Sequence, residues 1–582
     1  MKISKSVFLV FFCIFFSACS SVSVSPGSGG SGGSAGTGGT SGTGGSSENV
    51  GTVDINQDRY DIGSPTLFNV YFSPTGSSDN DGLTPSTPLR YLNSIKNFIR
   101  TREGVTDRDA VLTLSRTGYQ INLAPGTYSD EDTGHVMDNI QGTAEFPIII
   151  KSSSTAQGGD AIVQTDLEFD HVKYLYLMNF TISRHGDALH ISHSDHVLVS
   201  NMILNGGTYD GHGADSISSV AHDMFKVNQA QYIFFEDSLA SGADDNVMDW
   251  VAVQVGHVVG NTIHNSHDWC GYVKGGSSYI VVENNLIYDC YNGGFTAGQG
   301  TGFEYMVAPW LFYETMDVKI INNVIHDTHG AGLGVAGGYN TLLAYNTLYK
   351  VGDDLHEYGR AQAFDIVHGG RECDHDGDLL GYCNTNLSQG GWGQPFSSSS
   401  EVHIPSKNIF IYNNIVYNPD TYNTIDAVFN VDAPVTTNAD DSNIPSPSIV
   451  DSNLVIKGNF IYANPWPGHE SSLFSHAEGC ATSNTTCNAT LVNANNSINA
   501  AVPQFQSLDP DNTHFLKPTA SGNIFSVTTY SPPDFAWLDV PSLNETATTR
   551  TPSAGNLSNT ILVDKSGNAR TGSSIPGAYS EP

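Results

Sequence analysis

The stretch Tyr279-Ile-Val-Val-Glu-Asn-Asn285-Leu-Ile decides the fold, because its pattern recurs along the chain. Apolar and polar residues alternate, an asparagine follows, and a second short apolar pair comes next. Close copies lie at 318–325 and 409–416, and the pattern extends from 160 to about 465. The equivalent positions are 179, 201, 237, 261, 285, 323, 346, 414 and 459, and differences such as 285 − 261 = 24 and 346 − 323 = 23 give the period.

This pattern predicts an all-β fold, a right-handed parallel β-helix or solenoid. A period in the low twenties, built from short alternating strands with no helical stretch between them, means that each strand pairs with its copy one coil further on. We expect the recurring asparagine at the turn between two strands, because its side chain tolerates left-handed backbone geometry and can hydrogen-bond its copies above and below. The gap from 346 to 414 predicts long loop insertions on one face.

Both ends of the repeat carry segments of a different kind. Residues 88–101 place apolar side chains at helical spacing, which predicts an amphipathic helix over the open end of the first coil. These side chains are Leu89, Leu92, Ile95 and Ile99. The segment Ile575-Pro-Gly-Ala-Tyr579 resembles the last strand of secreted β-helix proteins. We therefore expect a solenoid with an N-terminal capping helix.

The first residues have the features of a bacterial export signal. Lys2 and Lys5 precede an apolar run that is too short to span a bilayer, and Phe16-Ser-Ala-Cys19 resembles a lipobox, in which Cys19 is acylated. We expect an outer-membrane or cell-surface lipoprotein, or a secreted protein, that touches a membrane only through its lipid anchor. The predicted parts are a signal peptide at 1–19, a flexible Gly/Ser-rich linker at 20–51 and a β-helix domain at 52–582, with an N-terminal cap at 60–130, core coils at 145–465 and C-terminal coils and loops at 466–582.

The cysteine spacing fits an oxidising compartment. Beyond Cys13 and Cys19, six of the 8 cysteines remain, an even number. Cys373 with Cys383, and Cys480 with Cys487, each close a short polar loop, so we predict two disulfides. Cys270 and Cys290 lie one coil apart and either pair or stack. The spacing of these cysteines is not that of metal ligands.

The chain is strongly acidic, with a formal net charge of −35 and only 24 Lys and Arg against 59 Asp and Glu. Such a surface argues against binding to nucleic acid or to anionic lipid headgroups. An anionic polysaccharide would need local basic residues or bound cations to overcome the repulsion. We expect the protein to be a monomer.

The repeat also places lysines and aspartates on neighbouring coils. Lys226 is 237 − 11 and Lys274 is 285 − 11, which predicts one row two coils apart. Asp223 is 237 − 14, while Asp245 and Asp249 are 261 − 16 and 261 − 12, so three carboxylates flank that row. Because paired strands lie about 4.8 Å apart, these groups are expected within roughly ten ångströms of one another.

With Asp244, four carboxylates then gather on one sheet, where they repel unless a cation joins them. Calcium is hard, accepts several carboxylate oxygens and is available outside cells, so we predict a calcium site. The alternative is that these aspartates only solvate turns in an acidic protein.

Three short segments resemble the family 9 polysaccharide lyases, which are calcium-dependent pectate lyases on a right-handed parallel β-helix. The segments are Asp223-Met-Phe-Lys226, Asp244-Asp-Asn-Val-Met-Asp249 and Gly271-Tyr-Val-Lys274-Gly-Gly276. In that family the corresponding segments supply the calcium ligands and the base. The resemblance implies that Asp223, Asp244, Asp245 and Asp249 bind calcium and that Lys274 is the base. The acidic segment has one residue more than the family pattern, which leaves open whether Asp244 or Asp245 binds the metal.

Eliminative cleavage requires both a cation and a base. The C5 proton of a 4-linked uronic acid is hard to remove until the neighbouring carboxylate is neutralised. A lysine takes that proton only when its amine is uncharged, which desolvation and a nearby divalent cation favour. We therefore predict a calcium-dependent lyase that acts on an acidic polysaccharide through Lys274. Lys226 contacts substrate charge or pairs with neighbouring aspartates.

Two other functions remain open. One is a glycoside hydrolase that uses Asp244, Asp245 or Asp249 as acid and base. The other is a non-catalytic surface protein that binds glycans. Arg360 and Arg371 of the long insertion are further candidates for binding substrate carboxylates, because guanidinium groups bind carboxylates in a bidentate manner, with ion pairs inside the insertion as the alternative.

Overall fold

The computed structural model describes residues 59–129, 134–184, 187–207, 221–352, 362–373, 380–395, 402–419, 427–436, 442–463, 472–475, 479–535, 557–570 and 575–582. All of them belong to one unit of the chain, Val50–Pro582. The predicted signal peptide, the lipidation site Cys19 and most of the linker and its junction lie outside the described residues, as does Arg360. In the described part of the chain, no helix combines the length and the hydropathy that crossing a membrane requires.

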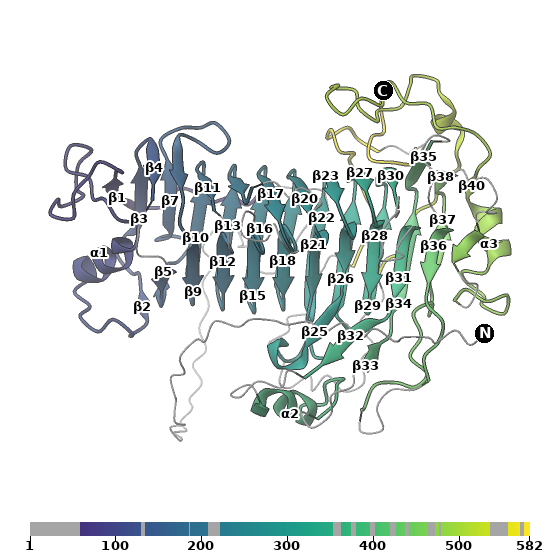
Figure 1. Ribbon diagram of the computed structural model, residues 1–582, viewed down its shortest axis with the longest axis horizontal. Helices are drawn as coiled ribbons and strands as arrows, with labels where there is room; N and C mark the ends of the chain where they lie inside the picture. The colour runs from purple at the N-terminus through teal and green to yellow at the C-terminus, as the bar shows by residue number, and fades with distance from the viewer. Residues whose placement is uncertain are drawn as a thin grey trace, which may run out of the picture. The chain divides into compact units, whose positions relative to one another are not determined.

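The described strands form three long sheets in which successive coils pair in parallel (Figure 1). Strands of one coil are shared among the three sheets, and each strand pairs with the equivalent strand of the next coil. For example, β16 pairs with β19 so that Gln231 lies beside Gln254, a step of 254 − 231 = 23 residues. The predicted right-handed parallel β-helix is confirmed.

The bounds of the strands follow the three faces of the solenoid. Sheet A contains β1 (Leu67–Phe72), β3 (Gly118–Leu123), β7 (Ile148–Ser152), β10 (Lys173–Met178), β13 (Asp195–Ser200), β16 (Gln231–Glu236), β19 (Gln254–Val259), β22 (Ser277–Glu283), β26 (Thr315–Ile321), β29 (Gly338–Ala344), β34 (Lys407–Tyr412) and β37 (Val455–Lys457), with β2 (Leu112–Thr113) and β6 (Ile140–Gln141) beside this path. Sheet B contains β4 (Gly126–Tyr128), β8 (Ala161–Val163), β11 (Thr181–Ser183), β14 (Ile203–Asn205), β17 (Leu239–Ala243), β20 (Thr262–Ser266), β23 (Leu286–Cys290), β27 (Val324–Thr328), β30 (Thr347–Val351), β35 (Ile415–Asn418), β38 (Phe460–Ala463) and β40 (Ser497–Ile498). Sheet C contains β5 (Gly134–Asp138), β9 (Leu167–Asp170), β12 (Leu189–Ser192), β15 (Phe225–Asn228), β18 (Met248–Val251), β21 (Trp269–Lys274), β24 (Gly293–Ala297), β28 (Ala331–Ala336), β31 (Gln362–Val367), β36 (Ala427–Val431) and β39 (Ser472–Ser475).

Alternation along each strand separates the core from the surface. In sheet C, Val227, Trp250 and Val273 stack in register and are fully buried. The residues between them project outward, because successive side chains of a strand point to opposite faces. The inward rows of the three sheets form one continuous apolar core along the coils. Each buried aliphatic or aromatic side chain stabilises the solenoid by about 1.5–3 kcal/mol relative to exposure.

The recurring asparagines occupy two adjacent rows, which corrects the single ladder expected from the sequence. Asn179, Asn201 and Asp237 have positive φ and belong to the row of left-handed turn residues. The hydrogen-bonded ladder lies one residue later, where each side-chain amide donates to the next asparagine; it consists of Asn261, Asn285, Asn323, Asn346, Asn414, Asn459 and Asn496. Ser238 holds the ladder position in the coil of Asp237, and its N–H donates to Asn261. Left-handed geometry and ladder bonding are thus separate tasks on consecutive residues.

The predicted capping helix is present as α1 (Ser94–Glu103), which packs against β5. Ile95 and Ile99 are buried beneath it. The helix begins later than the expected residue 88, because 91–93 form a turn in which the Ser94 N–H and hydroxyl both bond to the Tyr91 carbonyl oxygen. Gly104, with φ 74°, ends the helix in the left-handed conformation.

The long insertions leave the solenoid beside sheet C. They contain sheet D, formed by β25 (Gly300–Gly302), β32 (Gly369–Glu372) and β33 (Val402–Ile404), together with the 3₁₀ turn η2 (Phe303–Tyr305) and helix α2 (Leu380–Ser388) (Figure 1). The predicted disulfides Cys373–Cys383 and Cys480–Cys487 are both present, and Cys270 pairs with Cys290. Helix α3 (Ala489–Asn495) and the 3₁₀ turn η4 (Asn523–Ser526) follow toward the C-terminus.

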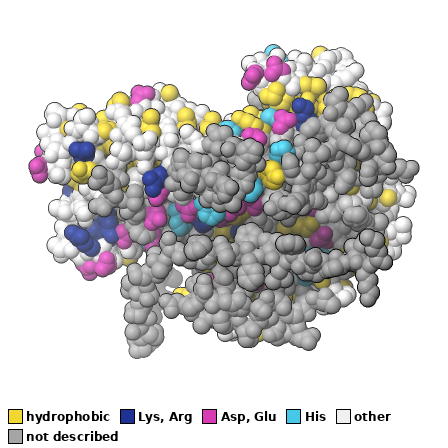
Figure 2. All heavy atoms as spheres, in the orientation of Figure 1, with side chains coloured by type: hydrophobic (Ala, Val, Ile, Leu, Met, Phe, Trp, Pro, Cys, Tyr) yellow, Lys and Arg dark blue, Asp and Glu magenta, His cyan; other side chains and the backbone are white. Residues whose placement is uncertain are grey.

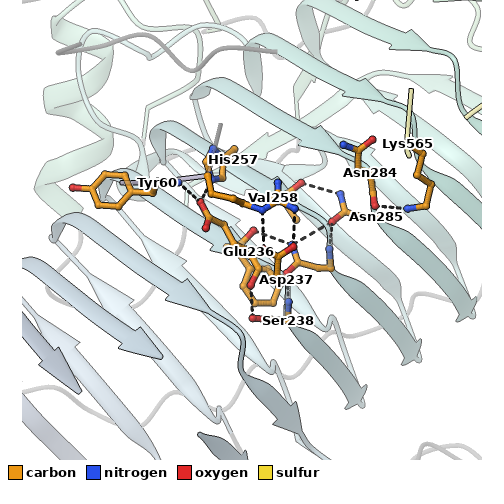
Figure 3. Close-up of polar contacts among 12 residues, drawn as sticks. Tyr60, Glu236, Asp237, Ser238, His257, Val258, Asn284, Asn285 and Lys565 are labelled. Atoms are coloured by element: carbon orange, nitrogen blue, oxygen red, sulfur yellow. Dashed lines mark hydrogen bonds and ion pairs between the residues drawn. The ribbon is translucent and has the colours of Figure 1, made fainter. Parts of the chain in front are cut away.

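Residues from both ends of the described chain bind beside the turn rows. Figure 3 shows Tyr60 and His257 directed toward Glu236, and Lys565 directed toward Asn284. The segment Ile575–Tyr579, expected as the last strand, is not part of a sheet: Gly577 donates to the Asn413 carbonyl oxygen and Ala578 packs against sheet B. The last strand of sheet B is β40. The C-terminal segment therefore covers the outside of the coils instead of extending them.

Lys565 gives a pH-dependent contribution to stability. The residue is partly exposed, but its amine lies against Asn284, and burial lowers the pKa of Lys565 from 10.5 to about 7, with Arg59 acting in the same direction. Between these values the unfolded chain holds a proton that the folded chain lacks, so raising the pH stabilises the folded state. We expect the stability of the wild type relative to Lys565→Met, measured by urea unfolding, to increase between pH 7 and 10 by on the order of 1 kcal/mol per pH unit. A difference that stays constant over this interval would contradict the assignment.

Candidate active site

The outer face of sheet C gathers the charged residues expected from the sequence. Figure 2 shows acidic, histidine and lysine or arginine side chains together over β12, β15 and β18. Pairing of these strands with β21 places His190, Lys226, Asp249 and Tyr272 side by side on consecutive coils. These residues project outward because they alternate with the buried core residues of the same strands.

The structure corrects the predicted row of lysines. Lys226 lies in register with Asp249 and Tyr272, whereas Lys274 lies in register with Val251, two residues further along the strand. The reason is the turn that follows: 278 − 272 = 6 residues lead from β21 to the paired position of sheet A, against 254 − 249 = 5 in the preceding coil. Counting back from the ladder therefore misplaced Lys274. A shift of two residues keeps its side chain on the same face of the sheet.

Lys226 forms ion pairs with two of the predicted metal ligands. Its ammonium lies 2.8 Å from Asp223 Oδ2 and 3.5 Å from Asp249 Oδ2. Burial alone would lower the pKa of Lys226, but the charges of Asp223 and Asp249 outweigh it and raise the pKa. Lys226 is therefore a fixed cation, and of the two predicted roles it has that of a partner for neighbouring aspartates.

Asp245 completes an acidic group with Asp223 and Asp249. One ligand atom each from His222, Asp223 and Asp245 lie within 4.8 Å of one another. The protein packed around Asp245, together with the negative charges of Asp223, Asp268 and Asp249, raises the pKa of Asp245 to about 8, although its side chain is 40% exposed. The direction of this shift means that negative charge exceeds positive charge around Asp245.

The donor set fits a divalent cation. Among the described residues, the buried oxygens Asp249 Oδ1 and Asn246 Oδ1 have no hydrogen-bond partner. Buried oxygens without a partner are costly unless something outside the chain binds them. The four carboxylates of Asp223, Asp245, Asp249 and Asp268, set against the two ammonium groups of Lys226 and Lys274, leave a formal charge of −4 + 2 = −2. Hard oxygen ligands with this net charge suit calcium.

The structure separates the paired aspartates of the sequence. Asp245 joins the acidic group, while Asp244 does not interact electrostatically with Asp245 in the way that Asp223, Asp249 and Asp268 do. The backbone of Asp244 bonds to Ala221 and to His267. Asp223, Asp245 and Asp249 are therefore the predicted ligands that the fold brings together.

Sequence reasoning missed Asp268, whose carboxylate accepts hydrogen bonds from Asn292 Nδ2 at 2.5 Å and Gln299 Nε2 at 3.3 Å. The signal was available, because Asp268 follows Asp245 by 268 − 245 = 23 residues, one coil, and its N–H donates to the Asp245 carbonyl oxygen. Gln299 had no such signal, because it lies in an insertion outside the repeat.

Lys274 lies at the end of β21, at the edge of this group. Its amine donates to Gln299 Oε1 at 2.9 Å and lies 4.2 Å from the centroid of the Tyr272 ring. Lys274 also interacts electrostatically with Asp245. An amine, a fixed ammonium and an excess of carboxylates thus share one face of the sheet.

Arg371, predicted to bind substrate, is wholly enclosed. Its side chain and that of Glu314 are both 0% exposed, and Nη2 lies 2.5 Å from Glu314 Oε1. Nη1 donates to the Phe312 carbonyl oxygen at 2.9 Å. The substrate-binding prediction for Arg371 is therefore wrong, because the insertion closes around the guanidinium instead of exposing it.

The fold and this cluster define a parallel β-helix protein with an acidic, lysine-containing site on one sheet. No protein-family model matches the chain, and no relative is found among curated proteins. Among solved structures, it is similar to pectate lyase Pel9A (11% identity, 81% of this chain and 94% of that chain, TM-score 0.34). It is also similar to a glycoside hydrolase (10%, 69% and 97%, TM-score 0.38) and to the A-module of a mannuronan C-5 epimerase from Azotobacter vinelandii (10%, 62% and 90%, TM-score 0.32). Because identity and TM-score are low in each case, these likenesses carry no argument about the activity of this chain.

Proposed function

We propose that this protein is a calcium-dependent polysaccharide lyase that cleaves a uronic-acid-containing polysaccharide by β-elimination. The observation that supports it best is the presence, on one face, of an amine at Lys274 beside an acidic group with unpaired buried oxygens. Asp223, Asp245 and Asp249 would hold calcium, with Asn246 and His222 close by. When bound, calcium neutralises the uronate carboxylate and so makes the C5 proton more acidic.

In this proposal the chain itself removes and positions the proton. Lys274 takes the C5 proton, the electrons of that bond form the C4–C5 double bond, and the C4–O4 bond breaks as the leaving oxygen gains a proton. Gln299 orients the amine through the 2.9 Å hydrogen bond. Lys226 holds the carboxylates of Asp223 and Asp249 in place. General base catalysis of this kind typically contributes about 10²- to 10⁴-fold to the rate.

A glycoside hydrolase is the second candidate. Asp245 and Asp268 come from consecutive coils of the same face, and hydrolases need two carboxyl groups on either side of the scissile bond, one as acid and one as base or nucleophile. Under this reading the acidic group would act chemically instead of holding a metal.

A panel of polysaccharides separates these functions. The full chain is incubated with pectate, alginate, glycosaminoglycans and a neutral glycan, with calcium or with chelator. Elimination gives unsaturated products that absorb near the ultraviolet limit, whereas hydrolysis gives reducing ends without that absorbance. Calcium-dependent absorbance on a uronate polymer is the expected result. Reducing ends alone would favour the hydrolase, and binding without cleavage would favour a non-catalytic surface protein.

A further inference from the structure

We infer that the buried ion pair of Glu314 and Arg371 positions Lys274, so that both residues act on the reaction without touching the substrate. The inference rests on the proposed role of Lys274 as the base. It assigns a task to Arg371 that replaces the substrate contact expected from the sequence.

Glu314 binds the chain immediately after Lys274. Its Oε2 accepts a hydrogen bond from the Gly275 N–H at 3.0 Å, and its carbonyl oxygen accepts one from the Gly276 N–H at 2.9 Å. The two N–H groups that follow Lys274 therefore both end on one fully buried residue. The direction in which β21 ends, and with it the base of the Lys274 side chain, depends on where Glu314 sits.

The turn at Gly275 and Gly276 needs such an anchor. Both glycines have positive φ, 67° and 81°, a conformation that glycine adopts readily along with many others. A Cβ at Gly276 would lie 2.2 Å from the Trp310 carbonyl oxygen, so no other residue fits this close approach. Two flexible residues in succession would leave Lys274 free to move unless their N–H groups were held.

Arg371 keeps Glu314 charged and in place. A carboxylate without exposure to water is strongly disfavoured unless a cation and further donors bind it. Arg371 supplies the cation at 2.5 Å, and Thr301 Oγ1 donates to Glu314 Oε2 at 2.6 Å. Burial lowers the pKa of Arg371, and the charge of Glu314 opposes that effect. The pair is therefore mutually dependent.

Sheet D connects this pair to the Lys274 amine as well. Thr301 in β25 lies in register with Arg371 in β32, and Gln299, directly before β25, accepts the hydrogen bond of the Lys274 amine. The Gly370 N–H donates to the Gln299 carbonyl oxygen at 3.2 Å. One small sheet thus holds both ends of Lys274, its backbone through Glu314 and its amine through Gln299. A misplacement of about 1 Å at a reacting group can cost on the order of 10²-fold in rate.

Glu314→Gln tests the inference on the full chain, with the polysaccharide that the wild type cleaves. The expected result is a kcat lower by on the order of 10²-fold with KM and the calcium Kd unchanged, because the acidic group does not touch Glu314. Thr301→Val, which removes one hydrogen bond to the same carboxylate, should lower kcat by a smaller factor and serves if Glu314→Gln does not fold. Arg100→Met is the matched control, because Arg100 is equally buried and binds backbone carbonyl oxygens next to α1, far along the chain from the site.

Two outcomes overturn the inference. One is an unchanged kcat in both Glu314→Gln and Thr301→Val. The other is an equal loss of kcat in Arg100→Met, which would mean that any destabilising change in a buried residue has this effect. If instead the wild type produces no unsaturated product on any polymer, the proposed function fails, and that failure is distinct because it is seen before any variant is made.

Discussion

Lys274→Ala is expected to lower kcat for elimination by about 10²- to 10⁴-fold while the calcium Kd stays unchanged. Lys274 supplies the amine nearest the acidic group that is not itself paired with Asp223 and Asp249, and the variant leaves the C5 proton without an acceptor. Lys274→Arg separates base from charge, because a guanidinium keeps the positive charge but does not give up its proton. Both variants should therefore be equally slow. The measurement is the initial rate of ultraviolet absorbance on the cleaved polymer.

The control for Lys274→Ala is Lys173→Ala, which removes a half-exposed lysine from the outer surface of sheet A. This variant should retain the wild-type kcat. Full activity of Lys274→Ala, or recovery of activity in Lys274→Arg, would rule out proton transfer to Lys274. In the second case the residue would act through its charge alone.

Removal of calcium is the second change with a large expected effect. Chelation should abolish the formation of unsaturated product, and added calcium should restore it, because the acidic group carries excess negative charge without a divalent cation. Asp245→Asn should weaken calcium binding, measured by titration calorimetry, by at least about 10-fold. Loss of one carboxylate removes both a ligand oxygen and a unit of the charge that attracts the ion.

Asp244→Asn is the matched control for Asp245→Asn, because it makes the same chemical change one residue earlier. Since the fold directs Asp244 away from the acidic group, its calcium Kd should equal that of the wild type. Equal weakening in both variants would show that the effect is one of general charge. Full activity in the presence of chelator would remove calcium from the mechanism.

The acidic site was partly predictable from the repeat. Asp223, Asp245 and Asp249 were found by register because strands of a solenoid pair at a nearly constant step, so a difference in residue number converts directly into a distance. Lys274 was displaced by two positions because the step changes where a turn gains a residue, and the Gly275-Gly276 turn is such a place. Asp268 lay within the reach of the same counting.

Residues from the insertions could not be placed in this way. Gln299, Thr301 and Arg371 belong to segments that leave the repeat, so their numbers carry no coil position. Arg371 looked like an exposed cation in a polar loop, and only the closure of the insertion around Glu314 shows it to be buried.

The sequence by itself determined the solenoid, because a period of alternating strands can bury its apolar residues only by stacking coil on coil. It also determined which residue types share the face of sheet C. The tertiary structure alone decided which of these side chains meet, since the length of each turn and the return of an insertion depend on contacts between residues far apart in the chain. That is why Asp245 but not Asp244 joins the acidic group, and why Arg371 binds Glu314 behind Lys274 instead of facing solvent.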